Sequence, residues 1–91
     1  MVIGVMEVGL KIPGSFSLKD KRRVRQSLTS RLRRMGFSVA EVADEESHNH
    51  LVLGLSFVSA SEQIVEKKLD EALFLIGEMG EICELERESF R

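Results

Sequence analysis

Apolar and polar positions alternate over residues 2 to 12, so that every second residue belongs to one apolar set. Such alternation is typical of a strand with one face buried in a core. Pro13 and Gly14 then interrupt the pattern, and we expect a loop there. The positions predicted to face the core are Val2, Gly4, Met6, Val8, Leu10 and Ile12.

A helix is predicted over residues 18 to 35, where apolar positions recur every three or four residues. Ser17 precedes Asp20 by three residues, which resembles a capping box with Asp in place of the usual Glu. Gly36 is the expected end of this helix. The apolar stripe comprises Leu18, Val24, Leu28, Leu32 and Met35.

Two strands, a second helix and a last strand are predicted in the remaining sequence. FSVAEVADE indicates a short half-polar strand and HLVLGLSFVS a more apolar one, and we expect the two to form a hairpin. The helix is expected over residues 60 to 79, with a capping box that begins at Ser59. EICELERES is the expected last strand.

This order of elements predicts an α+β fold, a ferredoxin-like βαββαβ sandwich. Its four-stranded antiparallel sheet is expected to have the order 4-1-3-2, with both helices on one face. The first and third strands are the most apolar, which suits the centre of the sheet, whereas the other two carry acids typical of exposed edges. With 91 residues, 43% of them hydrophobic, the chain is expected to form a single domain over residues 1–91.

The other face of such a sheet has no helix to cover it. Phe74 is likewise expected on the outer side of the second helix. A homodimer that buries these exposed groups would stabilise a small domain, so we expect one. The residues predicted to project from the uncovered sheet face are Ile3, Val5, Val52 and Val58, with the small residues Gly54 and Ser56.

Positive charge is concentrated in SLKDKRRVRQSLTSRLRR, which holds eight of the thirteen Lys and Arg residues of a chain with a net charge of −2. Ordinary solvated helices pair acids and bases at i,i+4, but Asp20 is the only acid here. Lys21, Arg25 and Arg31 fall nearer the apolar stripe, with their heads expected at its edge. The side opposite the stripe carries Lys19, Arg22, Arg23, Arg33 and Arg34.

Two functions fit this basic helix. One is a non-enzymatic RNA- or ribosome-associated domain that binds phosphates of structured RNA through the helix. The chain has no Trp or Tyr, which argues against base stacking on the sheet. The alternative is a protein-interaction or oligomerisation module whose basic helix meets an acidic partner. A solvated helix balanced by the acidic half of its own chain or of a partner subunit would explain the same charges without a binding function.

The loop IPGSFS before the helix offers an anion site formed by backbone N–H groups with Ser15, Ser17 and Lys21. It lacks the Gly-Lys-Ser/Thr ending of a nucleotide-binding loop. A tight turn followed by a helix cap explains the same residues without a ligand.

His48 and His50, beside Asp44, Glu45 and Glu46, are the only plausible group of metal ligands that the sequence indicates. They would need further ligands in an exposed turn, so we expect a solvated hairpin end, no metal and no cofactor. Cys83 is expected to be a small buried residue. No Ser or Cys stands in a recognisable nucleophile setting, so no catalytic residue and no enzymatic activity are predicted.

A cytoplasmic location is expected, without membrane association. No run of eighteen apolar residues is present, and MVIGVMEVGLKI lacks the basic start and cleavage site of a signal peptide. A single cysteine cannot form an internal disulfide, which agrees with a reducing compartment.

The stretch IPGSFSLKDKRRV after an N-terminal strand, followed by SVAEV and a leucine-rich strand, resembles the YlxP-like family of small bacterial proteins. The resemblance covers nearly the whole chain. It implies a ferredoxin-like domain and a link to translation, because genes of this family often neighbour those for an initiation factor and a ribosome-binding factor. It implies no catalytic residues.

Overall fold

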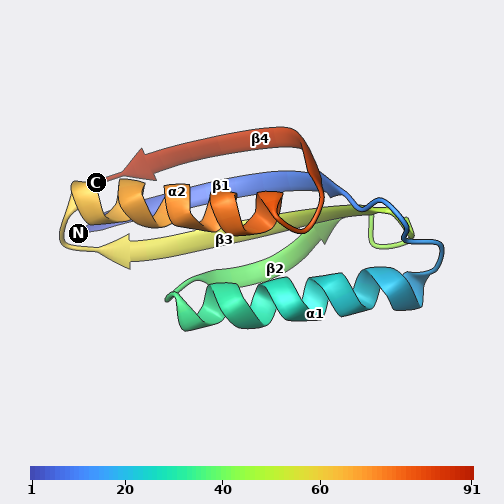
Figure 1. Ribbon diagram of the computed structural model, residues 1–91. Coiled ribbons are helices and arrows are strands. Elements are labelled where there is room, and N and C mark those ends of the chain that lie inside the picture. The colour runs from blue at the N-terminus through green and yellow to red at the C-terminus, as the bar shows by residue number, and fades with distance from the viewer.

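Four antiparallel strands form one sheet in the order β2-β3-β1-β4, which is the predicted order 4-1-3-2 seen from the other edge (Figure 1). The predicted ferredoxin-like βαββαβ arrangement is therefore confirmed. The computed structural model describes residues 1–91. Its elements are β1 (Val2–Lys11), α1 (Leu18–Arg34), β2 (Ser38–Ala43), β3 (His50–Ser59), α2 (Glu62–Gly77) and β4 (Glu81–Phe90).

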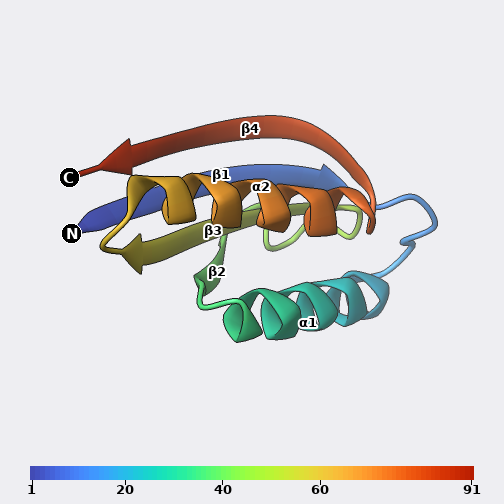
Figure 2. The same ribbon diagram turned by 60° about the vertical axis from the view of Figure 1, so that its left-hand side comes forward.

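Both helices lie on the same side of the sheet, α2 over β1 and β3 and α1 over β2 (Figure 2). One core joins the predicted inner face of β1 to Leu28 and Leu32 of α1 and to Leu69 of α2. Gly4 lets α2 come close to β1, because a Cβ there would lie 2.5 Å from Cγ1 of Val65. Neither helix combines the length and the apolar character needed to cross a bilayer.

The start of α1 is as predicted. The Ser17 hydroxyl accepts a hydrogen bond from the backbone N–H of Asp20 (3.1 Å), and the Asp20 carboxylate accepts one from that of Phe16 (3.1 Å). At the other end, Gly36 has a φ of +100°, a left-handed value that favours glycine after a helix.

The start of α2 differs from the prediction. Ser61, and not Ser59, is the capping residue, since its hydroxyl accepts a hydrogen bond from the backbone N–H of Ile64 (3.3 Å). The Ser59 hydroxyl instead accepts one from the backbone N–H of Ser61 (3.2 Å). The two serine hydroxyls thus accept successive backbone hydrogen bonds in the turn that leads into α2. The helix begins two residues later than predicted.

The sheet face without helices is apolar at one end, as predicted, with Val58 55% exposed. Val52 belongs to this face as predicted, since the register sets it opposite Gly9, but its side chain is only 4% exposed and adds little to the open apolar surface. The pairing of β2 with β3 shifts between Glu41 and Ala43, so Val42 is an extra residue, and its side chain reaches over Gly54 and crowds this part of the face.

Four glutamates also belong to this uncovered face. Residues directly opposite each other in the β1–β4 pair share a face, and residues two apart along a strand do too. The register sets Val5 opposite Glu88, Glu7 opposite Glu86, and Gly9 opposite Glu84. We call the residues Glu7, Glu84, Glu86 and Glu88 the acidic sheet face.

Candidate functional site

A buried ion pair holds α1 against β2. Lys21 was predicted to place its head at the edge of the apolar stripe, but it is 2% exposed. Its ammonium contacts Oε2 of Glu41 at 2.8 Å and donates to the backbone carbonyl of Asp44 at 2.7 Å. Arg25 donates to Oε1 of Glu41 at 3.1 Å. Glu41 occupies a core-facing position of β2, and its Oε2 atom has no partner other than the Lys21 ammonium. Lys21 is therefore drawn into the interior.

The electrostatics of this pair favour the ionised form of Glu41. Burial by itself raises the pKa of the Glu41 carboxyl. Hydrogen bonds and positive charge from Lys21 and Arg25 lower it by more, so the pKa lies below its ordinary value of 4.5. The Glu41 carboxyl is therefore ionised at neutral pH, and its contact with Lys21 helps to fix which side of α1 faces outward.

The outward side of α1 carries the five cations that the sequence predicts there. All five are exposed, and so is Arg31. None of these six makes an ion pair, so only Lys21 and Arg25 of the eight basic residues are balanced by the chain. We call Lys19, Arg22, Arg23, Arg31, Arg33 and Arg34 the basic surface.

Asp20 does not neutralise this surface. Its carboxylate is occupied at the helix start, where the hydrogen bond from the Phe16 backbone lowers its pKa. The Ser17 hydroxyl, Arg23 and Lys19 lower the pKa further. A negative charge at the N-terminus of a helix also interacts favourably with the helix dipole and stabilises the helix, so Asp20 has a structural role.

The side chains proposed for an anion site all have partners within the chain. The Ser15 hydroxyl donates to the backbone carbonyl of His48, Ser17 caps α1, and Lys21 pairs with Glu41. A turn and a helix cap account for these residues, and an anion at this loop stays a prediction.

Phe16 is a feature that the sequence analysis missed. It is 83% exposed and precedes Lys19, the first cation of the basic surface, by three residues along the chain. An exposed aromatic ring is able to stack on a nucleic-acid base. The signal in the sequence was an aromatic residue directly before the capping serine, where no apolar stripe includes it.

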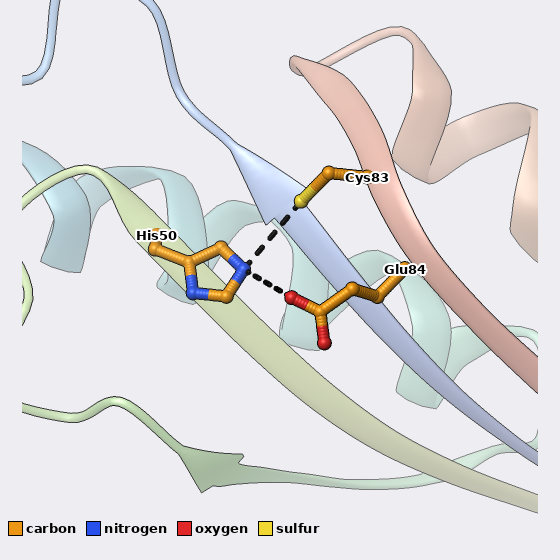
Figure 3. Close-up of side chains that lie close together, drawn as sticks. All are labelled: His50, Cys83 and Glu84. Carbon is orange, nitrogen blue, oxygen red and sulfur yellow. Dashed lines mark hydrogen bonds and ion pairs between the residues drawn. The ribbon is translucent and has the colours of Figure 1, made fainter.

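A second group of polar side chains meets at the end of the sheet where β1 ends and β3 and β4 begin, and Figure 3 shows three of its members. The Nε2 atom of His50 lies 3.2 Å from Oε1 of Glu84 and 3.5 Å from Sγ of Cys83. Its Nδ1 atom lies 2.6 Å from Oδ2 of Asp44. We call these four residues the His50 cluster.

Only some of the candidate metal ligands indicated by the sequence belong to this cluster. His50 and Asp44 come together as a pair, whereas His48 contributes only its backbone carbonyl to the hydrogen bond with Ser15. Cys83 was wrongly predicted to be buried: it is exposed, because β4 bulges at this point of a sheet edge. Glu84 was missed because only the pairing of β4 with β1 brings it to His50.

A groove of about 510 Å³ crosses the uncovered sheet face. Val5, Ala40 and Val42 give it an apolar floor together with Gly54, and three members of the acidic sheet face form one wall. The only cation in its lining is Arg87, which is already paired with Glu66 and Asp70 of α2, so the groove is a binding surface without evident chemistry.

Similar solved structures confirm the fold. The de novo designed protein Foldit4 has 12% identity and a TM-score of 0.59, covering 99% of this chain and 96% of its own. The designed protein Ferredog-Diesel has 14% identity and a TM-score of 0.55, covering 94% and 83%. A variant of SnoaB, a cofactor-independent oxygenase from Streptomyces nogalater, has 10% identity and a TM-score of 0.54, covering 99% and 91%.

At these identities the likeness extends to the fold alone, so SnoaB's oxygenase chemistry is not carried over. No curated protein matches the sequence. A sequence family does match, under the description "Protein of unknown function (DUF503)", over residues 3–88. Because that match spans nearly the whole chain, including the basic helix and the His50 cluster, the protein belongs to the DUF503 family.

Proposed function

We propose that this protein is a non-enzymatic, cytoplasmic RNA-binding domain that holds phosphates of structured RNA on its basic surface. One observation carries the proposal: six exposed cations of α1 lie together and none has an acidic partner in the chain. Like charges at helical spacing repel by about 0.2–0.5 kcal/mol per pair, so a polyanion that neutralises them is favoured.

Geometry and resemblance both favour RNA as that polyanion. From Lys19 to Arg34 the basic surface extends over about 22 Å, which is enough for several consecutive phosphates. Phe16 adds an exposed ring at one end. The resemblance of IPGSFSLKDKRRV to YlxP-like proteins implies a link to translation, and ribosomal RNA or ribosomal particles are the corresponding partners.

The double substitution Arg22→Gln and Arg23→Gln is the direct test. Affinity for a structured ribosomal RNA fragment should fall about 10- to 100-fold at low salt, because two charge-assisted phosphate contacts are lost. Weakening should be similar for all RNA sequences, since phosphates carry no sequence information. Fluorescence anisotropy measures it.

The matched control is Lys11→Gln with Lys67→Gln. Both lysines are exposed and lie outside α1, so this variant has the same net charge as the double arginine variant. Its RNA affinity should stay within about twofold of the wild type. Equal losses in the two variants, or no binding by the wild type, would contradict the proposal, and preferential competition by polyglutamate would point to an acidic protein partner.

Self-association through the uncovered sheet face is a second candidate, favoured by the groove and by the exposed side chains of Val58 and Phe90. Symmetric pairing would set the acidic sheet faces of two copies against each other, and their repulsion is screened by salt. The dimer should therefore strengthen as salt rises, as light scattering over a concentration series would show.

The salt dependence of self-association distinguishes the symmetric dimer from two other outcomes. A dimer that weakens with salt would indicate instead that the basic surface of one copy meets the acidic sheet face of another. A strict monomer at every salt and protein concentration would remove self-association altogether.

A further inference from the structure

We propose that the His50 cluster binds a zinc ion through Nε2 of His50, Sγ of Cys83 and Oε1 of Glu84. The three ligand atoms come from two strands that are far apart in the sequence, and all lie within 4.8 Å of one another. Figure 3 shows the cysteine sulfur and the glutamate oxygen on the same side of the imidazole ring, toward its Nε2 atom.

The distances fit tetrahedral zinc. With zinc bonds of about 2.0–2.1 Å to nitrogen, 2.3 Å to sulfur and 2.0–2.2 Å to oxygen, tetrahedral ligands lie about 3.6 Å (N to S) and 3.4 Å (N to O) apart. The observed separations are 3.5 Å from Nε2 to Sγ and 3.2 Å from Nε2 to Oε1. Sγ and Oε1 lie no more than 4.8 Å apart, against about 3.6 Å for tetrahedral zinc, so these two side chains must approach each other as the site closes around an ion.

A bulge in β4 makes this arrangement possible. Neighbouring residues of a regular strand point to opposite faces, so Cys83 and Glu84 would not both reach His50. The β1–β4 register passes from Gly9 opposite Glu84 to Leu10 opposite Ile82, which leaves Cys83 as the extra residue. The bulge thus turns both side chains toward one imidazole.

Gly9 provides the space for the site. A Cβ at this position would lie 3.0 Å from Cβ of Glu84 and 3.1 Å from Nε2 of His50. Any other residue would press on the atom that is proposed to bind the metal. The Gly9 carbonyl also lies 3.4 Å from the Cys83 sulfur, which holds the thiol at the site before a metal displaces its proton.

Asp44 is the positioning residue. Metal-binding histidines usually donate their other ring N–H to a carboxylate, which orients the ring and fixes its tautomer. Nδ1 of His50 lies 2.6 Å from Oδ2 of Asp44, and the Asp44 backbone is anchored by the Lys21 ammonium at 2.7 Å. The carboxylate thus comes from a residue that the buried ion pair of α1 holds in place.

The donor set selects the metal. A thiolate and an imidazole favour zinc over magnesium or calcium, which prefer all-oxygen sites. Three protein ligands leave a fourth position for water, and this position is open to solvent because Cys83 and Glu84 are exposed. On binding, the Cys83 thiol loses its proton to solvent as the sulfur–zinc bond forms, so affinity should rise with pH.

Cobalt(II) is the spectroscopic probe for the test, with the reduced full chain free of any histidine tag. Binding at the site should give tetrahedral cobalt bands together with a thiolate-to-cobalt charge-transfer band, and zinc should abolish both. Cys83→Ser should lose the charge-transfer band. Asp44→Asn should keep the band but weaken metal affinity about 10- to 100-fold, as expected for a residue that orients a ligand.

His48→Gln is the matched control, because His48 is exposed two residues away and its ring is outside the cluster. It should bind cobalt and zinc like the wild type, whereas His50→Gln should not. No charge-transfer band in the wild type, a band that survives Cys83→Ser, or equal losses in the two histidine variants would overturn the proposal. Circular dichroism checks that each variant is folded.

Discussion

Replacing Glu41 with Gln should lower the free energy of unfolding by about 3 kcal/mol at neutral pH, since it leaves the Lys21 ammonium buried without a counter-charge. Removing one partner of a buried pair typically costs about 3–5 kcal/mol. The lower end is expected because Lys21 keeps its hydrogen bond to the Asp44 carbonyl. Urea unfolding followed by circular dichroism measures the loss.

Three further variants separate the pair from its surroundings. Lys21→Met should cost less than Glu41→Gln, because Glu41 keeps Arg25 at 3.1 Å. Lys21→Met combined with Glu41→Leu should recover most of the loss, since apolar replacement of a buried pair is often neutral. Glu45→Gln, which removes an exposed acid beside the hairpin, should change stability by less than about 0.5 kcal/mol.

The difference between wild type and Glu41→Gln should shrink in acid. The pKa of Glu41 lies below 4.5 in the folded chain, so near that pH the unfolded chain binds more protons than the folded one. Stability from the ionised carboxylate is thus complete above pH 4.5 and is lost as the pH falls through the folded pKa. A difference that stays constant across this range would show that Glu41 acts by packing alone.

Periodicity was enough to predict the core and the order of the strands. The alternation in β1 and the three-to-four spacing in α1 depend only on which residues are apolar, and the buried set includes Leu10, Leu28 and Leu32 as expected. The two most apolar strands, β1 and β3, lie in the centre of the sheet. These features are local or follow from burial, so one sequence determines them.

Features that depend on pairing between strands were not predictable in the same way. Val42 reaches over Gly54 because of a bulge in β2, and Cys83 and Glu84 reach His50 because of a bulge in β4. A bulge shifts the register by one residue, which changes the face of each side chain beyond it. Alternation within a single strand carries no signal of that shift.

The buried Lys21 shows a different limit. Its position at the edge of the apolar stripe was read correctly, but a long side chain at such a place is able to turn toward solvent or toward the core. Glu41 decides the outcome, because it occupies a core-facing position of β2 and attracts the ammonium inward. An acid among the apolar positions of a strand was the available signal, and pairing it with Lys21 required knowledge of the packing.

Salt should weaken RNA binding by the wild type about 50- to 150-fold between 50 and 200 mM, if four cations of the basic surface contact phosphates at once. Each contact releases about 0.7–0.9 counterions, so the slope of log affinity against log salt should be about −2.8 to −3.6. The exposed cations are free to make such contacts because no acid of the chain competes for them. Anisotropy titrations at several salt concentrations give the slope.

The variant with Arg22→Gln and Arg23→Gln should flatten that slope by about 1.4–1.8, because two contacts no longer release counterions. Its deficit relative to wild type should therefore shrink about tenfold over the same salt range. Lys11→Gln with Lys67→Gln should keep the wild-type slope. A wild-type slope near zero, or an unchanged slope in the arginine variant, would mean that the RNA is held elsewhere and that the cations of α1 are simply solvated.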